Sequence, residues 1–496
     1  MTITAAAQWA AFTPIRTPED YLASLRGRKI DVHLFGEKIA DPVDHPIIRP
    51  SINALARSYQ LAIDEPELAT AHSDLIDAPV NLFLHIVASP QDLVMKSRMQ
   101  RKMGQLTGTC FQRCTGLDAI SVLHSITYDI DAKHGTSYHT RFIAFLKQAQ
   151  RNNLLIAAGM TDPKGDRSKR PSEQIDPDLF MHVTKRDAAG IYVTGAKAHM
   201  TGGLNSHWIC VMPTMNMGPA DKDYAVVGMI PTDSPGLTFI YGRQSCDTRA
   251  LEAGSIDKGN AEYGGQEVLV VFDNVFIPHE HVFMDGEYEF AQDMVARFTS
   301  YHRASYVCKT GLGDVMVGAA AAIAEFNGAD GASHIKDKLV EMTHLNETIY
   351  SSAVASAHEA KPLASGIYMN DAMLANVCKQ NVTRFPYEIS RLAQDIAGGL
   401  LVTMPSEQDF DDETTGPMLR KYLKGRGNVP VEHRQRMLRL IENMTLGRNA
   451  VGYLTESMHG AGSPQAQRIQ ILRGMEVERK KGYAEALAGI EYTDAV

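Results

Sequence analysis

The first residues whose types and spacing could support chemistry are Cys110 and Cys114, four positions apart in the segment GTCFQRCTG. The chain has only six cysteines in 496 residues. If this segment is helical, the two side chains lie one turn apart on the same face, where two thiolates can share a metal ion or a cluster. Cysteine is also a common small packing residue, so the spacing alone leaves both interpretations open.

A second segment, SYHRASYVC, places His302 and Cys308 six positions apart. With Cys110 and Cys114 they form a Cys3His set, which suits either zinc or an iron–sulfur cluster. Six steps along an α-helix turn about 600°, which leaves the two side chains about 120° apart. If both bind one group, the segment must be bent, bulged or non-helical. Of the other cysteines, Cys210 is expected to pack within a strand, Cys246 to be a thiol in a loop and Cys378 to lie in the core on a helix.

Composition places the chain among globular proteins of two to four domains, with 44% hydrophobic and 22% charged residues. The net charge of -9 is spread out, and no basic run suggests a nucleic acid or membrane partner. The N-terminal segment does not have the pattern of a secretory signal, and no stretch has the roughly 18 apolar residues of a membrane span. We therefore expect a cytoplasmic protein, in which clustered cysteines are reduced.

The order of secondary structure predicts an α+β fold: a helical domain over 1–155, a β domain over 156–285 and a helical domain over 286–496. Ser51 is a candidate N-cap for a helix over 52–63. The charged segment 409–427 is expected to be an exposed loop. Further helices are predicted at 95–106, 111–126, 141–152, 387–396 and 434–442, with one apolar face formed by Ile335, Leu339, Met342, Leu345 and Ile349. Strands are predicted at 180–185, 190–197, 208–212, 224–230, 237–241 and 267–272.

Two polar loops, 159–167 and 197–205, lie at the start of the β region. Each alone is consistent with ordinary turns, but together they could bracket a flat cofactor between hydroxyl and backbone donors. Gly398 and Gly399 permit close backbone approach, for example to a pyrophosphate, or else close packing of two helices.

Long segments of the chain are similar to one flavoprotein family. They are FGEKIADPVDHPIIRPSIN, CFQRC, MTDPKGDR, GRQSCDTR, GGQEVLVVFDNVFIP, SHIKDKLVEMTHLNET, CKQNVTRFPYEI and TESMHGAGSPQAQR. Through them the chain resembles the 4-hydroxyphenylacetate 3-hydroxylase-like flavoproteins, and within these the 4-hydroxybutyryl-CoA dehydratase branch. The resemblance implies an acyl-CoA dehydrogenase-like architecture, with a β-barrel-like middle domain and a C-terminal helical bundle.

The resemblance also implies cofactors, partners and residue roles. It implies FAD and one 4Fe–4S cluster per chain, an acyl-CoA substrate and a homotetramer. The cluster ligands would be Cys110, Cys114, His302 and Cys308. The residues around the substrate would be Tyr306, Lys309, Glu267 and Glu456. The flavin surroundings would include Met160, Thr161, His199 and Thr201, with the loop residues Lys164 and Arg167 and the glycines Gly398 and Gly399 as further candidates.

The implied reaction is the dehydration of 4-hydroxybutyryl-CoA to crotonyl-CoA, with isomerisation of vinylacetyl-CoA. Because the β-hydrogen of this substrate is not acidic, the family is expected to use a transient radical. His302 or Glu456 could be the base, Tyr306 could position the substrate, and the iron bound by histidine could act as a Lewis acid. Three alternatives remain open: an aromatic monooxygenase that uses reduced FAD, a non-catalytic binding protein, and zinc in the Cys3His set.

Overall fold

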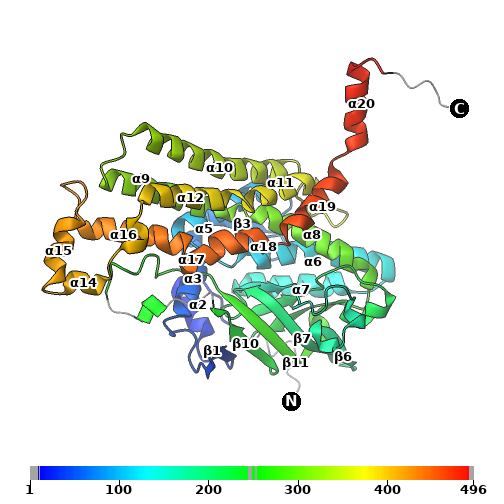
Figure 1. The fold of residues 1–496 in the computed structure, drawn as a ribbon. Helices are drawn as coiled ribbons and strands as arrows, with labels where there is room; N and C mark the ends of the chain where they lie inside the picture. The colour runs from blue at the N-terminus through cyan, green and yellow to red at the C-terminus, as the bar shows by residue number, and fades with distance from the viewer. Residues whose placement is uncertain (1–8, 10–11, 244–247, 252–253, 491–496) are drawn as a thin grey trace.

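The computed structural model describes residues 9, 12–243, 248–251 and 254–490. Cys246, which was expected to be a loop thiol, lies outside the described residues. Figure 1 shows long helices at one end of the molecule and most of the strands at the other. The helical span Tyr288–Phe326 is apolar enough to cross a membrane by composition, but 67% of its most apolar window is buried inside the protein.

The first section of the chain is mainly helical but contributes to a sheet. Its helices are α2 (Pro18–Leu25), α3 (Arg49–Asp64), α4 (Pro66–Ala69), α5 (Pro90–Thr107), α6 (Cys114–His134) and α7 (Tyr138–Asn152). Its strands are β1 (Asp31–Leu34), β2 (Glu37–Lys38), β3 (Thr70–Ser73) and β4 (Ala78–Asn81), which the sequence did not predict. Strand β1 pairs with the two-residue strand β2 on one side and in parallel with β10, some 200 residues later, on the other, so it joins the sheet only through long-range pairing.

The predicted N-cap at Ser51 is wrong, because α3 begins two residues earlier, at Arg49. Pro50 occupies the first turn, where its missing N–H costs nothing and its fixed φ favours the helix. The hydroxyl of Ser51 instead donates a hydrogen bond to the Ile48 carbonyl oxygen at 2.7 Å.

The middle section forms two sheets. All six predicted strands are present, as β6 (His182–Arg186), β7 (Gly190–Thr201), β8 (Trp208–Val211), β9 (Val226–Pro231), β10 (Leu237–Tyr241) and β11 (Glu267–Pro278), and β5 (Ile156–Gly159) and β12 (Val282–Asp285) are additional. The strand order is β2-β1-β10-β11-β7-β6 in one sheet and β12-β9-β8-β5 in the other. Along β7, buried and partly exposed residues alternate, as expected for a strand with one face on the core.

The last section is again helical. It contains α8 (Ala291–Ser305), α9 (Cys308–Phe326), α10 (Ser333–His358), α11 (Ala372–Val382), α12 (Phe385–Ala397), α13 (Leu400–Thr403), α14 (Glu407–Asp411), α15 (Thr415–Tyr422), α16 (Val431–Thr445), α17 (Arg448–Ala450), α18 (Glu456–His459), α19 (Pro464–Gly474) and α20 (Val477–Leu487), with a short hairpin of β13 (Lys361–Pro362) and β14 (Tyr368–Met369). The predicted apolar face of α10 is confirmed, with four of its five residues buried and Leu339 partly buried. The predicted loop over 409–427 is wrong, because this segment contains the helix α15. The Asp412 carboxylate precedes α15 and accepts hydrogen bonds from the backbone N–H groups of Thr414 and Thr415.

Helices α5 and α9 cross at two glycines. A Cβ on Gly104 would lie 2.5 Å from the Cys308 carbonyl oxygen, and a Cβ on Gly311 would lie 2.7 Å from the Gln105 backbone nitrogen. Real Cβ contacts are longer than this, so only glycine lets the two backbones come this close. The crossing fixes where α9 begins, and therefore where Cys308 lies.

We predict that Gly311→Ala lowers the free energy of unfolding by about 1–3 kcal/mol, because α5 must move away from α9. Gly318→Ala in the same helix is the control, since its Cβ would meet no atom within 4 Å. Alanine at that exposed helical position should stabilise the protein by about 0.5–1 kcal/mol. Urea unfolding midpoints of the two variants would measure the difference, and equal midpoints would contradict the proposed crossing.

Candidate active site

Cys110 and Cys114 are brought together by a turn and not by one helix. Helix α5 ends at Gly108, whose φ is 59°, and Gln112 has a φ of 67°, so the helix α6 begins only at Cys114. The buried Gln112 amide donates hydrogen bonds to the carbonyl oxygens of Ser51 and Gly264 at 3.0 and 3.1 Å, which hold the turn. The predicted helix over 111–126 therefore starts three residues late, and the inference of a shared helix face is wrong.

His302 and Cys308 lie on either side of a break between two helices. Helix α8 ends at Ser305, Tyr306 and Val307 form a turn, and α9 begins at Cys308. The segment is therefore not one straight helix, as predicted for the case in which both side chains bind one group; that shared binding stays a prediction.

The three thiols are buried neighbours. Burial raises the pKa of Cys110 and Cys114 well above the usual range, and it raises the pKa of Cys308 to about 11. The charge of Glu456 contributes to all three shifts, and the charge of Cys308 contributes to those of the other two thiols. Among the described residues no three His, Cys, Asp or Glu side chains are placed as a ligand set for one metal ion. The ligand assignment therefore stays a prediction.

Asp118 fixes the ring of His302. Its Oδ2 lies 2.8 Å from Nδ1 of His302, and its Oδ1 accepts hydrogen bonds from Lys96 and, at 3.0 Å, from Ser305. Burial opposes ionisation of this fully buried carboxyl, but the charges of Lys96 and His302 outweigh burial and lower its pKa. With Nδ1 held by a carboxylate, Nε2 of His302 is the nitrogen that remains to bind a metal or a proton.

Glu456 joins a cysteine to a lysine. Cys110 Sγ lies 3.3 Å from Oε1 of Glu456, and Lys309 Nζ lies 3.4 Å from its Oε2. A π-helical turn, Val451–Thr455, comes directly before Glu456, and its Gly452 packs against Cys110, with 3.3 Å from a would-be Cβ to the cysteine Cβ. Such π turns are rare and are frequent at functional sites.

Lys309 is a buried cation beside the thiols. Burial disfavours its charged form, but the charges of Glu456 and the three cysteines outweigh burial and raise its pKa. Its Nζ has no hydrogen-bond partner among the described residues. A buried ammonium whose one ion pair is with Glu456, next to three thiols, fits a negatively charged group held by those sulfur atoms.

Glu267 begins β11 opposite Thr201 of β7. The Thr201 hydroxyl donates a hydrogen bond to Oε1 of Glu267 at 2.7 Å. Burial, together with the charge of Glu456, raises the pKa of Glu267 well above its usual range. This carboxyl is therefore a candidate proton donor at neutral pH.

Tyr306 lies between His302 and two lysines. Its ring meets the His302 ring edge to face at 5.3 Å between centroids, and the Nζ atoms of Lys309 and Lys379 lie 5.3 and 3.6 Å from the ring centroid. A Cβ on Gly460 would collide with the tyrosine hydroxyl, so the chain after α18 closes against it.

The predicted flavin residues Met160, Thr161 and Lys164 occupy the loop after β5, and His199 lies on β7 beside it. The Ala198 N–H donates to the Thr161 carbonyl oxygen at 2.8 Å. His199 lies in a bulge of β7 with a φ of 54°, and its pKa is lowered by burial and by the Lys164 charge, so the two side chains are neighbours. Bulges of this kind redirect side chains next to active sites.

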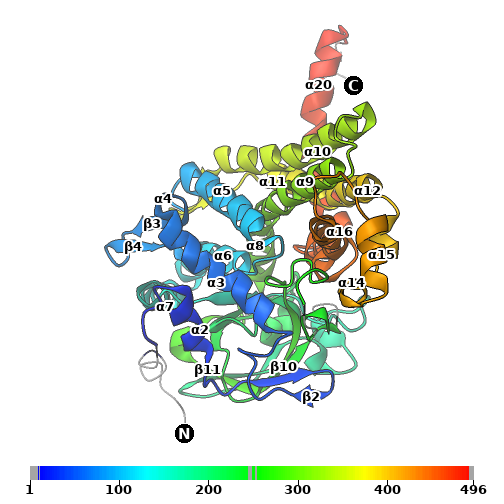
Figure 2. The same cartoon turned by 90° about the vertical axis from the view of Figure 1, so that its left-hand side faces the viewer.

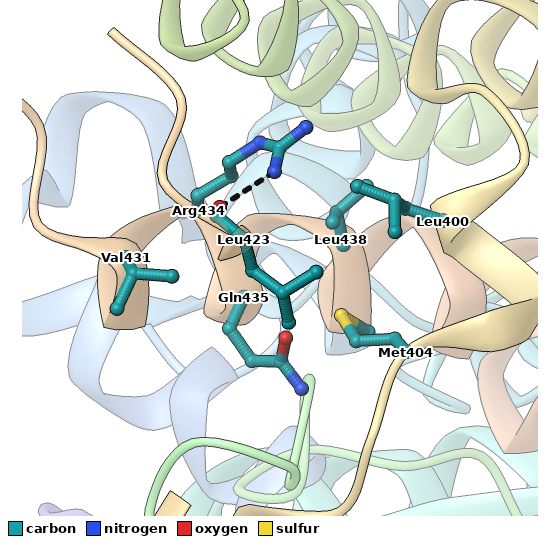
Figure 3. A pocket seen from close by; sticks show the side chains of 7 residues that line it. All are labelled: Leu400, Met404, Leu423, Val431, Arg434, Gln435 and Leu438. Carbon is teal, nitrogen blue, oxygen red and sulfur yellow. Dashed lines mark hydrogen bonds between the residues drawn. The ribbon is translucent and has the colours of Figure 1, made fainter. Parts of the chain in front are cut away.

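The remaining candidates lie in other environments. Arg167 is exposed further along the loop. Gly398 and Gly399 follow α12, and would-be Cβ atoms on them meet nothing within 4 Å, so close helix packing is not their role. Cys210 and Cys378 are buried in β8 and α11, as expected. Figure 3 shows a separate apolar hollow of about 10 Å³, lined by Leu400, Met404, Leu423, Val431, Arg434, Gln435 and Leu438. It has room for about one water molecule.

Sequence reasoning missed Asp118, Lys96 and Lys379. Asp118 carried a usable signal, because it follows Cys114 by four residues and so shares its face of α6. Lys96 and Lys379 carried none, since their partners come from other helices.

Comparisons with known proteins agree over nearly the whole chain. The sequence is 55% identical over 489 residues, 96% of this chain and 100% of the relative, to the 4-hydroxybutyryl-CoA dehydratase/vinylacetyl-CoA-Delta-isomerase of Clostridium aminobutyricum. The structure is similar to an oxygen-tolerant archaeal 4-hydroxybutyryl-CoA dehydratase from N. maritimus, with 63% identity, a TM-score of 0.96 and coverage of 97% and 96% of the two chains.

Monooxygenases are more distant. The oxygenase component of 4-hydroxyphenylacetate 3-monooxygenase, in a structure with FAD, has 24% identity, a TM-score of 0.83 and coverage of 95% and 98%, which shows a common fold. The 4-hydroxyphenylacetate 3-hydroxylase N-terminal and C-terminal family models match residues 17–284 and 291–489. The chain therefore belongs to the 4-hydroxyphenylacetate 3-hydroxylase family.

Proposed function

We propose that this protein is an enzyme that dehydrates 4-hydroxybutyryl-CoA to crotonyl-CoA and isomerises vinylacetyl-CoA. The observation that carries the proposal is the buried group of Cys110, Cys114, Cys308, His302 and Glu456, in a chain that is 55% and 63% identical to proteins of that activity. The 24% identity to aromatic monooxygenases gives no comparable support to the alternative activity.

We propose FAD and a 4Fe–4S cluster as its cofactors. The donor chemistry of Cys110, Cys114, Cys308 and His302 fits the cluster, and the buried Lys309 ammonium, whose Nζ makes no hydrogen bond among the described residues, fits its negative charge. The flavin would lie near Met160, Thr161, Lys164, His199 and Thr201, with Arg167, Gly398 and Gly399 as further candidates for its phosphates. When bound, the flavin would supply one-electron chemistry and the cluster a Lewis acid.

The side chains around this site would handle the protons. The reaction removes a proton from each of C2 and C3, expels hydroxide from C4 and returns one proton to C4. His302 or Glu456 would accept a proton, because one carries a free Nε2 and the other a carboxylate 3.4 Å from an ammonium. Glu267 would hold or return a proton, since burial keeps its carboxyl protonated.

Lys309 and Tyr306 would position the substrate. The Lys309 ammonium would stabilise negative charge that develops on a thioester oxygen or on the leaving hydroxide. The Tyr306 hydroxyl would orient the hydroxyl or the thioester, because its ring is fixed between His302 and Lys379.

We also propose three domains over 1–155, 156–285 and 286–496, with a barrel-like middle domain, in a cytoplasmic homotetramer that binds neither nucleic acid nor membrane.

The C-terminal helix supports self-association. Figures 1 and 2 show α20 extending alone from the body, and none of its residues is buried. Isolated helices of this length are marginal in water, so α20 needs a partner surface.

We expect about four iron and four sulfide per chain, with bound FAD, in protein purified without oxygen. Cys114→Ser should lose most of the iron and keep the flavin, because it removes one thiolate. Cys210→Ser is the matched control, since this buried cysteine lies in β8, and it should keep both cofactors. Iron, acid-labile sulfide and flavin assays measure the outcome. Wild-type protein that binds flavin but no iron would contradict the cluster and favour the aromatic monooxygenase.

We expect His302→Ala to abolish dehydration, because it removes both a cluster ligand and a candidate base. Crotonyl-CoA formation by the purified, flavin-loaded variant is the measurement. Turnover at the wild-type rate would refute the role of His302.

We expect removal of residues 475–496 to weaken the tetramer, since α20 would no longer cover a neighbouring chain. Sedimentation velocity across a dilution series would report the change. A double substitution of exposed residues on α20, Tyr483→Ser with Leu487→Ser, tests the same surface in the full-length chain. An unchanged tetramer in both would exclude α20 from the assembly.

A further inference from the structure

Lys379 is a buried lysine without a carboxylate partner. It lies on α11, which packs against α8, α10 and α19, and it is 0% exposed. In the described part of the chain no carboxylate lies in ion-pair contact with it. Burial, together with the charge of Lys309, lowers the pKa of Lys379 well below its usual range. A lysine held at this cost is unusual as a packing residue, because a methionine would fill the same space without it.

The two contacts of the Lys379 amine belong to two other elements. Its Nζ donates a hydrogen bond to the Ser457 carbonyl oxygen in α18, directly after Glu456. The same Nζ lies 3.6 Å from the centroid of the Tyr306 ring, in the break between α8 and α9. An amine or ammonium over an aromatic face is attracted by the negative charge of that face.

The contacts of Lys379 therefore join the Tyr306 ring to the backbone of α18, at the residue that follows Glu456. We propose that Lys379 is a positioning residue, which holds Tyr306 and the Glu456 segment of α18 in one fixed arrangement around the substrate. The proposal rests on the proposed function for its catalytic consequence, but the contacts themselves are independent of it.

Two neighbouring features limit the freedom of the same groups. Gly460 leaves room for the Tyr306 hydroxyl and for no further atom. Arg303, also buried, donates to the Ala461 carbonyl oxygen at 3.1 Å and to Asn376 Oδ1 at 2.7 Å, which ties the segment after α18 to α8 and α11. Of the two buried basic side chains Arg303 and Lys379, Lys379 is the one that contacts both the Tyr306 ring and α18.

The test compares Lys379→Met with Cys378→Ala, the adjacent buried residue of α11, whose thiol faces the Ile349 carbonyl oxygen at 3.7 Å. Lys379→Met should keep flavin and iron content, keep or raise Tm, and lower kcat about 10–100-fold with little change in KM. Cys378→Ala should lower Tm and keep kcat, because it removes only packing atoms. Lys379→Arg should recover part of kcat, since it supplies N–H groups to the same two partners.

Wild-type kcat in Lys379→Met would overturn the proposal, and so would a fall in Tm with unchanged kcat. If that variant does not fold, the comparison uses Lys379→Gln, which retains an N–H donor; failure of both to fold would establish a purely structural role and overturn it.

A thermal double-mutant cycle with Tyr306→Leu separates this proposal from the proposed function. Shifts in Tm that are not additive are expected, because the two side chains touch. Additive shifts would contradict the contact, whereas a wild-type protein inactive on 4-hydroxybutyryl-CoA would contradict only the proposed function.

Discussion

The buried carboxylate of Asp118 is the interaction on which the rest of the site depends. It receives Lys96 from α5 and His302 and Ser305 from α8, while α6 carries Asp118 itself. A fully buried carboxylate is tolerated only when its partners are in place, and removal of one partner from such a group is costly. The three helices are therefore fixed relative to one another. Cys114 lies one turn before Asp118 on α6, so its position follows from the same contacts.

The break between α8 and α9 has a second structural origin. Gly104 and Gly311 let α9 start in backbone contact with α5, which fixes Cys308 at the first residue of α9. His302 is fixed from the other side by Asp118. Because Cys308 follows His302 by six positions, the chain between them has to turn if both side chains are to face one place, and Tyr306 lies in that turn. Tyr306, which contacts His302, Lys309 and Lys379, therefore lies where the helix is interrupted.

The sequence was informative where local pattern determines structure. Strands such as β7 and the apolar face of α10 were predicted because their periodicity matches their burial. Strand β1 was missed because its pairing with β10 is long-range, and α15 because its charged residues resemble a loop. The Cys3His set was found from residue types, but the helix predicted from residue 111 begins only at Cys114, because Gly108 and Gln112 adopt left-handed conformations. Asp118 and Lys379 depend on partners that only the folded chain supplies.

The charges of the site bear on the state of its sulfur atoms. Lys309 is buried beside the three thiols and Lys379 near Cys308, and among the described residues Glu456 is the one carboxylate in ion-pair contact with either lysine. Burial disfavours the charged form of Lys379. Glu267 does not balance them, because burial keeps it protonated. Arg303 adds a further buried cation whose hydrogen-bond partners are neutral. The raised pKa values favour protonated thiols when no group is bound, so deprotonated sulfur would depend on iron binding, which would place negative charge beside the Lys309 ammonium.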